Sequence, residues 1–381
     1  MNAENRRVAI VLNGPGRVGR QFAELLSEKR RYIQERTGFL PVLVTVVSRH
    51  GILCPEDLHE APSGLGIKPE DIEMWVRKAV GPDVSVRDYQ AVLHEIASVF
   101  GSPSSNAGLP GIVVEATPTD IFTGEPGLSH ISLAMNEGFS AISLSKGPLV
   151  VAFRELYSLA RVRKVKFKYS GAVAAALPTL DTALYSMAGA DIHRIEAVLN
   201  GTTNFILNRM GQGDGYLDAL KEAQRLGVAE SDPTLDVEGY DSAAKLLIIA
   251  NTLWNTAVKL SEIRREGITG LDKDEVVRLF REGTPVRLVA RAERLDSNNA
   301  DSGKTLPCSA GQKAGRYLLS VEPVPVPTEH PFNFLPGTSK AIRFVSKEMG
   351  EIVVSGGASD VLGAAAACMK DLIHILEEWN L

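Results

Sequence analysis

Two carboxylates and a lysine lie close together past the middle of the chain, with the spacing of an acid–base pair. Asp236, Asp241 and Lys245 fall within ten residues, and the last two are four apart. Residues four apart share one face of an α-helix, so this carboxylate and amine are within reach of each other. The apolar run 246–250 predicts that the helix enters a core. A lysine beside carboxylates at a core edge suits proton transfer; the alternative is a surface ion pair.

Length and composition exclude several classes of protein. The chain has 381 residues, enough for two or three domains. Its 41 basic and 46 acidic residues give a net charge of −5, which argues against nucleic-acid binding. No apolar run is long enough to span a bilayer, so we expect no membrane partner. The cysteines are too far apart for a disulfide framework or a zinc site, and this predicts a cytoplasmic protein (Cys54, Cys308, Cys368).

The elements that must position these residues begin with alternating strands and helices. Apolar, β-branched runs predict strands at 7–12, 41–47, 112–116 and 140–144, and residues 18–31 predict a helix. Uninterrupted apolar strands that alternate with helices indicate a parallel sheet covered on both faces. The predicted class is therefore α/β, with a Rossmann-type nucleotide-binding domain.

The remaining chain predicts a second, mixed α+β domain. We expect the nucleotide-binding domain to comprise residues 1–150 and about 335–381. Residues 56–111 are predicted to form a peripheral insertion with helices at 68–80 and 85–100. Residues 151–334 are predicted to form the substrate-binding and dimerisation domain.

A glycine-rich turn follows the first predicted strand and opens the first helix. Gly14, Gly16 and Gly19 have the spacing of the dinucleotide-binding turn, and their context makes the pattern specific. The first glycine allows the tight turn, the second lets the backbone approach a pyrophosphate, and the third allows close packing of helix on strand. Arg17 and Val18 would then contact the cofactor through the helix N-terminus. An ordinary glycine-rich turn is the alternative.

The end of the second strand indicates which dinucleotide binds. An acidic residue there would bind the ribose hydroxyls of NAD, whereas an arginine can accept the 2′-phosphate of NADP. The chain has Arg49 and no acid at this place. This favours NADP, with NAD as the other choice. Arg49 as a solvated loop cation, or stacked on the adenine, are the alternatives.

Two long motifs make the chain similar to a known enzyme family. Residues 199–206 read LNGTTNFI, and residues 226–246 read LGVAESDPTLDVEGYDSAAKL. Both resemble signature segments of homoserine dehydrogenases, and Gly337–Ile342 resembles a later segment of that family. The resemblance covers nearly the whole chain except 56–111. It implies a Rossmann-type domain, a dimerisation part and an open-faced mixed sheet that carries substrate.

The resemblance also implies a reaction and residue roles. Homoserine and aspartate 4-semialdehyde would interconvert by hydride transfer with a nicotinamide cofactor, in threonine and methionine biosynthesis. Glu230 and Asp241 would bind the substrate amino group, and Lys245 would handle the hydroxyl proton, with Lys146 as a second lysine and Asp236 in support. An ordinary lysine has a pKa of roughly 10.4, which burial and a nearby cation would lower towards that of a useful base. Lys146 as a solvated cation is the alternative.

Further positions follow from the same motifs. Asn200 and Thr202 are small polar groups at a strand end that would bind substrate, although such side chains also bond their own turns. Thr117, after a strand, would line the nicotinamide ribose, and Gly227 in the second motif would contact cofactor. The resemblance implies a homodimer, for which the apolar, alanine-rich segment 171–190 is a candidate surface; the alternative is that this segment belongs to a core.

The chain departs from the family pattern at two places. Ser170 stands where family members often have a glutamate that helps to hold a monovalent cation. Backbone carbonyls of Val173, Ala175 and Leu177 would still offer oxygen ligands to sodium, but the loss of the carboxylate counts against this site. Asp360 lies in a late glycine-rich run that the family uses near the cofactor, where a carboxylate would repel phosphate unless it points away.

These departures leave three readings of the function. The first is an NADP-preferring homoserine dehydrogenase. The second is a catalytically idle relative that binds nucleotide, which the residues at 170 and 360 motivate. The third is a dehydrogenase of the same fold that acts on another small amino or hydroxy acid, since fold alone does not determine function.

Overall fold

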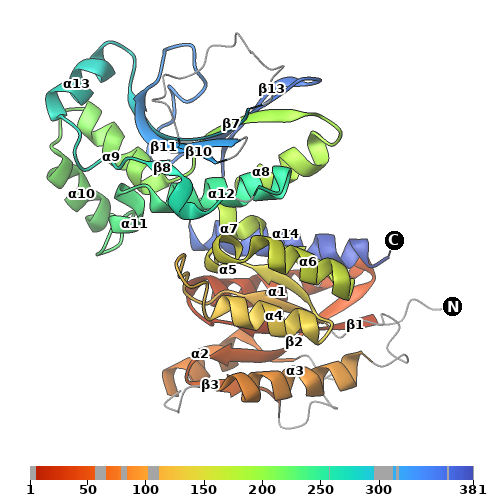
Figure 1. Ribbon diagram of the computed structural model, residues 1–381. Helices are drawn as coiled ribbons and strands as arrows, with labels where there is room; N and C mark the ends of the chain where they lie inside the picture. The colour runs from red at the N-terminus through yellow and green to blue at the C-terminus, as the bar shows by residue number, and fades with distance from the viewer. Residues whose placement is uncertain are drawn as a thin grey trace. The chain divides into compact units, whose positions relative to one another are not determined.

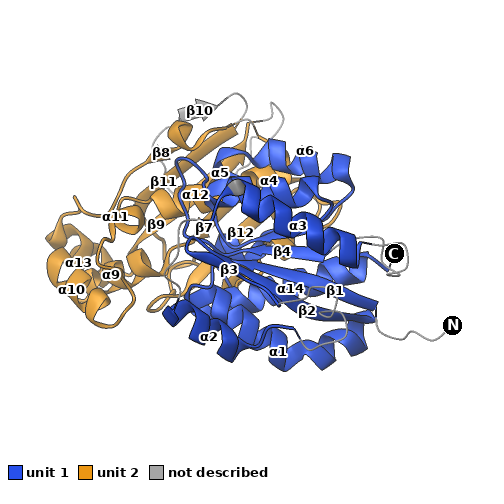
Figure 2. Ribbon diagram, turned by 90° about the horizontal axis from the view of Figure 1, so that it is seen from below, with its two compact units in different colours: residues 1–176, 360–381 blue, residues 177–359 orange. Residues whose placement is uncertain are grey.

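The computed structural model describes residues 6–55, 66–78, 84–101, 111–256, 258–295, 312–314, 317–357 and 360–380. It divides into two compact units, which Figure 2 colours separately. Unit 1 comprises residues 1–176 and 360–381, and unit 2 comprises residues 177–359. The predicted boundaries at 150 and about 335 were therefore misplaced. Residues 151–176 carry a strand of the first sheet, and residues 335–359 carry two strands of the second.

Unit 1 is built on a six-stranded sheet of order β3-β2-β1-β4-β5-β6 (Figure 1). Its strands are β1 (Arg6–Asn13), β2 (Phe39–Ser48), β3 (Gly51–Leu53), β4 (Gly111–Glu115), β5 (Ser140–Ser143) and β6 (Phe167–Lys168). All pair in parallel except the edge strand β3, which runs antiparallel to β2. The predicted Rossmann-type α/β architecture is confirmed.

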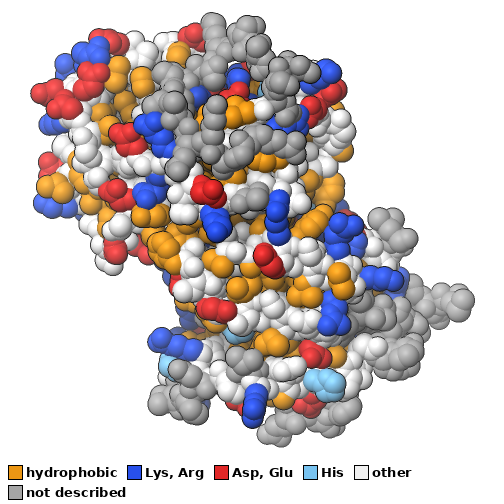
Figure 3. All heavy atoms as spheres, viewed as in Figure 1, with side chains coloured by type: hydrophobic (Ala, Val, Ile, Leu, Met, Phe, Trp, Pro, Cys, Tyr) orange, Lys and Arg blue, Asp and Glu red, His pale blue; other side chains and the backbone are white. Residues whose placement is uncertain are grey.

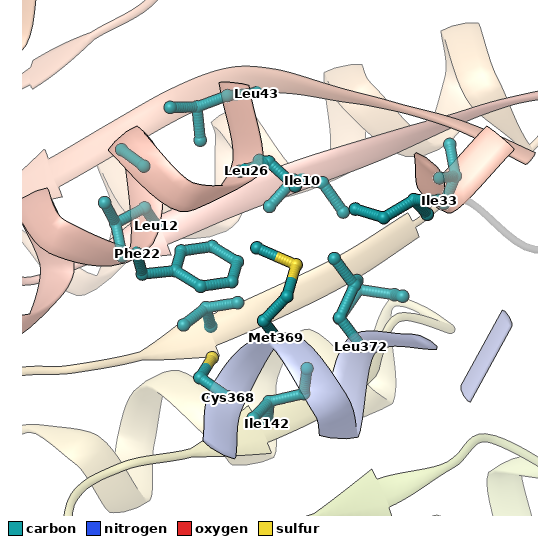
Figure 4. Close-up of a cluster of buried hydrophobic side chains, with 14 of the residues drawn as sticks. Ile10, Leu12, Phe22, Leu26, Ile33, Leu43, Ile142, Cys368, Met369 and Leu372 are labelled. Carbon is teal, nitrogen blue, oxygen red and sulfur yellow. The ribbon is translucent and has the colours of Figure 1, made fainter. Parts of the chain in front are cut away.

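Helices cover both faces of this sheet, as Figure 2 shows for α1 and α2 on one side and α3 and α4 on the other. The helices of unit 1 are α1 (Arg17–Thr37), α2 (Pro69–Lys78), α3 (Val86–Phe100), α4 (Gly127–Asn136), α5 (Gly147–Val151), α6 (Phe153–Arg163), α7 (Ser170–Ala174) and α14 (Val361–Glu378). The closing helix α14 packs against α1. Figure 4 shows their shared core, in which Phe22 of α1 and Met369 and Leu372 of α14 meet Ile10 and Leu12 of β1.

The described part of segment 56–111 is not peripheral, contrary to the prediction. Helix α3 buries an apolar stripe at helical spacing, made of Tyr89, Leu93, Ile96 and Phe100. The stripe packs on the β1, β2 and β4 side chains of one sheet face. This helix therefore supplies a covering layer that the sheet requires. Residues 56–65, 79–83 and 102–110, with most of the predicted polar linker, lie outside the described residues.

Unit 2 contains a seven-stranded, mainly antiparallel sheet. Its strands are β7 (Ile192–Val198), β8 (Arg264–Arg265), β9 (Val286–Arg294), β10 (Gln312–Ala314), β11 (Tyr317–Pro325), β12 (Lys340–Ser346) and β13 (Gly350–Gly356). Strand β7 lies between β9 and β12, and among the described strands of this sheet only β8 pairs in parallel. The later family segment Gly337–Ile342 leads into β12, which lies between β7 and β13.

The helices of unit 2 carry the residues of the long motifs. They are α8 (Thr179–Asp181), a π-helical turn (Thr182–Ser186), α9 (Gly201–Gly211), α10 (Tyr216–Arg225), α11 (Thr234–Val237), α12 (Tyr240–Trp254), a 3-10 turn (Leu260–Glu262) and α13 (Lys273–Arg281). Helix α12 matches the predicted core helix, since residues 242–244 and 246–251 are buried. None of the described helices is long and apolar enough to cross a lipid bilayer.

Candidate functional site

The turn between β1 and α1 is shaped by its glycines. Gly14 has a φ of +86°, and a Cβ placed on it would lie 2.6 Å from the backbone of Ala116 and Thr117. A Cβ on Gly19 would lie 2.2 Å from the carbonyl oxygen of Gly14. Neither position can accept a side chain without a shift of the backbone. A Cβ on Gly16, in contrast, would meet no described atom within 4 Å, so this position faces open space.

This open space lies at the N-terminus of a 21-residue helix. Gly16 is the N-cap of α1 and makes no side-chain capping bond, and Arg17 and Val18 occupy the first helical positions. The first N–H groups of a helix have no partner within the helix and attract anions. The residues present therefore fit the pyrophosphate of a dinucleotide.

The other predicted cofactor residues of unit 1 lie at the carboxyl ends of parallel strands. β1 has β2 on one side and β4 on the other, which makes the β1/β4 edge the switch point where such sheets bind ligands. Arg49 follows β2, is exposed, and its Nε donates to Nε2 of His50 at 2.7 Å. Lys146 follows β5 and donates its backbone N–H to Oγ1 of Thr119 at 3.3 Å.

A buried carboxylate that sequence reasoning missed lies at this edge. Glu115, the last residue of β4, is 0% exposed. Its Oε2 accepts from Nδ2 of Asn13 at 3.2 Å and pairs with Nδ1 of His130 at 2.8 Å. Its Oε1 accepts both the backbone N–H of Thr117, at 2.9 Å, and the Thr117 hydroxyl. An acidic residue inside an otherwise apolar buried strand was the available sequence signal.

In unit 2, the lysine and carboxylates of the long motif come together as predicted. Lys245 of α12 donates from Nζ to Oδ2 of Asp241 at 2.6 Å and to the carbonyl oxygen of Leu199 at 2.9 Å. The two side chains are 15% and 12% exposed, so the pair lies at the rim of a core. An ammonium has three donors, and these contacts use two. The amine is thus held in place with one position left for an oxygen atom.

Asn200 organises the two carboxylates. Its Nδ2 donates to Oδ1 of Asp236 at 2.6 Å and to Oδ2 of Asp241 at 2.9 Å. Its Oδ1 accepts the backbone N–H of Thr203 at 2.9 Å, which makes it the N-cap of α9. Because both amide hydrogens are used in this way, the geometry indicates a positioning role. Direct contact of Asn200 with substrate stays a prediction.

The remaining motif residues are more loosely placed. Thr202 donates its hydroxyl to the carbonyl oxygen of Val228 at 2.9 Å. Glu230 is exposed, and among the described residues its carboxylate makes no hydrogen bond to the lysine cluster. Gly227, predicted to contact cofactor, has a φ of +71° in the turn after α10 and belongs to unit 2. Asp232 accepts hydrogen bonds from the hydroxyl and the backbone N–H of Thr234, which lower the pKa of Asp232 and are typical of a turn residue.

The departure at Ser170 is matched by a buried aspartate from the end of the chain. Asp371 of α14 accepts the Ser170 backbone N–H and hydroxyl, both at 2.8 Å. Asp371 is 1% exposed and lies 3.3 Å from Nζ of Lys370, which also donates to Ser170. The Ser170 hydroxyl therefore contacts a carboxylate that lies 201 positions away in the chain.

The predicted sodium ligands are divided between the units. Val173 lies in α7, and Ala175 follows it with a φ of +51°, a conformation that favours glycine. Leu177 begins unit 2, and its carbonyl oxygen accepts the N–H of Thr179 at 2.8 Å. Among the described residues, no group of three or more His, Cys, Asp or Glu side chains is arranged to hold a metal ion.

The departure at Asp360 has a local structural role. Its Oδ1 accepts the backbone N–H of Gly363 at 2.7 Å, which makes it the N-cap of α14. An aspartate is favoured at this position because it satisfies a free N–H and lies at the positive end of the helix. The carboxylate is thus committed to its own helix.

Comparison with known proteins identifies the family of the chain. The family model described as homoserine dehydrogenase matches residues 178–373. An NAD(+)-dependent homoserine dehydrogenase of Pseudomonas canavaninivorans is 30% identical over 374 residues, which cover 96% of this chain and 95% of the relative. The chain belongs to the homoserine dehydrogenase family.

Solved structures of the homoserine dehydrogenase family share the fold. A putative homoserine dehydrogenase from Archaeoglobus fulgidus superposes with a TM-score of 0.77 at 28% identity, covering 97% of this chain and 99% of that one. A mutant hyperthermophilic archaeal homoserine dehydrogenase in complex with NADPH has a TM-score of 0.70 at 23% identity, covering 96% and 97%. These relatives differ in cofactor: the Pseudomonas enzyme is described as NAD(+)-dependent, and the archaeal mutant was solved with NADPH.

Proposed function

We propose that this protein is an NADP-preferring oxidoreductase that interconverts homoserine and aspartate 4-semialdehyde. The observation that carries the proposal is the fixed amine of Lys245, held by Asp241 and the Leu199 carbonyl in a motif of the homoserine dehydrogenase family. A dinucleotide would be held by the turn of Gly14, Gly16 and Gly19 at the start of α1. When bound, its nicotinamide supplies the acceptor or donor of a hydride.

The lysine cluster accounts for the proton in this reaction. Oxidation of a primary alcohol to an aldehyde removes a hydride from carbon and a proton from oxygen. In the direction of oxidation, Lys245 as the neutral amine takes the hydroxyl proton at Nζ. In the direction of reduction, its ammonium donates that proton back to the oxygen. The two acceptors that hold Nζ leave one donor position for the substrate oxygen.

The carboxylates suit the substrate's ammonium group. Asp241 is positioned by Asn200 and Lys245, and Glu230 lies exposed on the segment before α11. Ionic hydrogen bonds between ammonium and carboxylate are about twice as strong as neutral ones. We assign Asp241 and Glu230 to this ammonium, Asp236 and Asn200 to the support of Asp241, Thr202 to a substrate oxygen, and Lys146 and Gly227 to the cofactor side.

The preference for NADP rests on Arg49. Its side chain is exposed directly after β2, where a 2′-phosphate is read in this architecture, and no acidic residue precedes it on that strand. A guanidinium binds phosphate with paired hydrogen bonds.

A homodimer is proposed on a separate ground. In segment 171–190, Leu184 and Tyr185 are 44% and 54% exposed. Exposed large apolar side chains of this kind are typical of surfaces that a partner covers.

On the face seen in Figure 3, basic and acidic side chains are interspersed, which favours a small-molecule substrate over nucleic acid as the partner.

A steady-state assay tests the function. The purified protein is offered homoserine with NADP and then with NAD, and the absorbance of the reduced cofactor is followed. Turnover with homoserine supports the proposal, and a lower KM for NADP supports the preference. Nucleotide binding without turnover on any small amino alcohol would favour the idle relative. Turnover only with another amino or hydroxy acid would favour the third reading.

A further inference from the structure

We propose that Glu115 is a positioning residue that turns the Thr117 hydroxyl into a pure hydrogen-bond acceptor for the nicotinamide–ribose half of the cofactor. The inference rests on the proposed function, since it takes the β1/β4 edge as the nicotinamide side. The carboxylate of Glu115 takes no part in the proposed reaction. Glu115 is fully buried, yet it lies one residue from the backbone that packs against the glycine turn.

The loop after β4 is fixed against the turn of β1. The backbone of Ala116 and Thr117 approaches Gly14 so closely that a Cβ on Gly14 would lie 2.6 Å from it. The Ala116 N–H also donates to the carbonyl oxygen of Asn13 at 2.8 Å. Thr117 is half-buried and stands where this loop leaves the sheet. Its hydroxyl is therefore held beside the place where the first glycine turns the chain.

Four donors converge on the Glu115 carboxylate. Two come from Thr117, through its backbone N–H and its hydroxyl, and the others are Nδ2 of Asn13 and Nδ1 of His130. A buried carboxylate requires such partners because its transfer out of water is unfavourable. Oε1 of Glu115 accepts both hydrogen bonds from Thr117, so the hydroxyl group of Thr117 is the donor in this contact.

The consequence for Thr117 follows from the number of its hydrogens. A threonine hydroxyl has one hydrogen and two lone pairs. Its hydrogen is directed to Oε1 of Glu115, so only lone pairs remain for a ligand. The matching group must be a donor. On the nicotinamide half of the cofactor, the donors are the ribose hydroxyls and the carboxamide N–H₂. A phosphate, which only accepts at neutral pH, is disfavoured at this point.

The elements that hold Glu115 come from both covering helices of this face. His130 lies on α4, and Tyr89 on α3 accepts from Nδ2 of Asn13 at 2.8 Å. The rings of Tyr89 and His130 are 4.8 Å apart between centroids. Helix α3, from the segment predicted to be peripheral, thus supports the base of the cofactor edge.

The test measures binding rather than turnover. The dissociation constants of NADPH and of ADP, which contains only the adenine half, are measured by fluorescence and calorimetry. We expect Glu115→Gln and Thr117→Val to weaken NADPH binding roughly three- to ten-fold, as for the loss of a hydrogen bond between neutral groups. ADP binding should change less than about two-fold. Thr117→Ser should restore NADPH binding. Glu155→Gln is the matched control and should leave NADPH binding unchanged, because Glu155 is exposed on α6 and is no part of this hydrogen-bond network.

A double variant decides whether Glu115 acts through Thr117. If it does, Glu115→Gln combined with Thr117→Val binds NADPH no more weakly than Thr117→Val alone. Additive losses, or an equal loss of ADP binding, would overturn the inference. If Glu115→Gln does not fold, a Thr117→Val variant that binds NADPH as tightly as the wild type would still overturn the inference. A wild type that binds NADPH but does not oxidise homoserine would refute the proposed function and leave this binding test intact.

Discussion

At the scale of the residue, the informative feature is how few contacts hold the amine of Lys245, the proposed acid–base group. Lys245 has one carboxylate and one backbone carbonyl as partners, and Asn200 positions the carboxylate. Such an arrangement restricts the amine without burying it completely, since 15% of the side chain remains exposed. A positioned base at the rim of a core can reach a small substrate from the solvent side.

Replacement of Lys245 tests its role in proton transfer. Lys245→Ala should lower kcat with homoserine by about 10²–10⁴-fold, the usual contribution of a general acid–base group. Homoserine binding, measured by calorimetry, should remain because the carboxylates are kept. Lys221→Ala, on the exposed side of α10, is the control and should leave kcat unchanged. A Lys245→Ala variant with full activity would remove the basis of the mechanism.

Replacement of Arg49 tests cofactor choice. Arg49→Ala should raise KM for NADP by roughly 10–100-fold, because an ionic hydrogen bond to the 2′-phosphate is lost. KM for NAD should change by less than about two-fold. Arg31→Ala is the control, since Arg31 is 90% exposed and forms an ion pair with Glu35 on the same helix. Equal weakening of both cofactors would show that Arg49 does not read the phosphate.

At the scale of the element, the strand–turn–helix of β1 and α1 separates two functions of glycine. Gly14 and Gly19 allow backbone segments to pack without side chains between them, whereas Gly16 faces open space. The first two serve folding, and the third leaves room for a ligand. The same sequence pattern therefore contains positions with different physical roles.

Alanine substitutions in the turn distinguish these roles. Gly14→Ala should lower the free energy of unfolding by about 2–4 kcal/mol, because a positive φ and a backbone clash add. Gly16→Ala should change stability by less than about 0.5 kcal/mol but weaken NADPH binding about ten-fold or more, since a methyl group occupies the space for the pyrophosphate. Urea denaturation and fluorescence titration measure the two effects. An equal loss of stability in the two variants would contradict the assignment of a folding role to Gly14 and a ligand-binding role to Gly16.

At the scale of the whole molecule, unit 2 owes part of its stability to a buried ionic network in its sheet. Glu196 of β7 pairs with Arg291 of β9 at 2.8 Å and with Arg343 of β12 at 2.6 Å. Burial by itself would raise the pKa of Glu196, but the His330 hydrogen bond and the two arginines outweigh it and lower this pKa to about 2. The network links three neighbouring strands.

Acid should therefore weaken the fold through Glu196. Its folded-state pKa of about 2 lies below its ordinary value of 4.5, so its stabilisation is present above pH 4.5 and is lost as pH falls towards 2. The loss is about 3 kcal/mol by linkage. Glu196→Gln should flatten this dependence in urea denaturation between pH 6 and 3. Glu222→Gln, whose partner Arg225 is at the surface, should retain the wild-type slope. An unchanged slope in Glu196→Gln would contradict the assignment.

Much of the architecture could be predicted from local sequence. Apolar patterns and turn-forming residues, which act over a few residues, predicted the strands near 7–12, 41–47 and 112–116 and helix α12. The glycine turn and the pair Asp241–Lys245 were likewise predictable, because their geometry depends on one turn of helix or one loop. Strands β9, β11 and β12 were missed, since their buried arginines and glutamates break the apolar pattern (Arg291, Glu322, Arg343).

Only the tertiary structure decided which residues far apart in the chain are in contact. Sequence alone determined the family, the glycine turn and the lysine with its neighbouring carboxylate. It did not show that Asp371 reaches Ser170, or that Tyr89 and His130 gather around Asn13 and Glu115. These contacts join elements by packing across a sheet and between helices. Such pairing depends on which faces are buried together, and no local spacing encodes it.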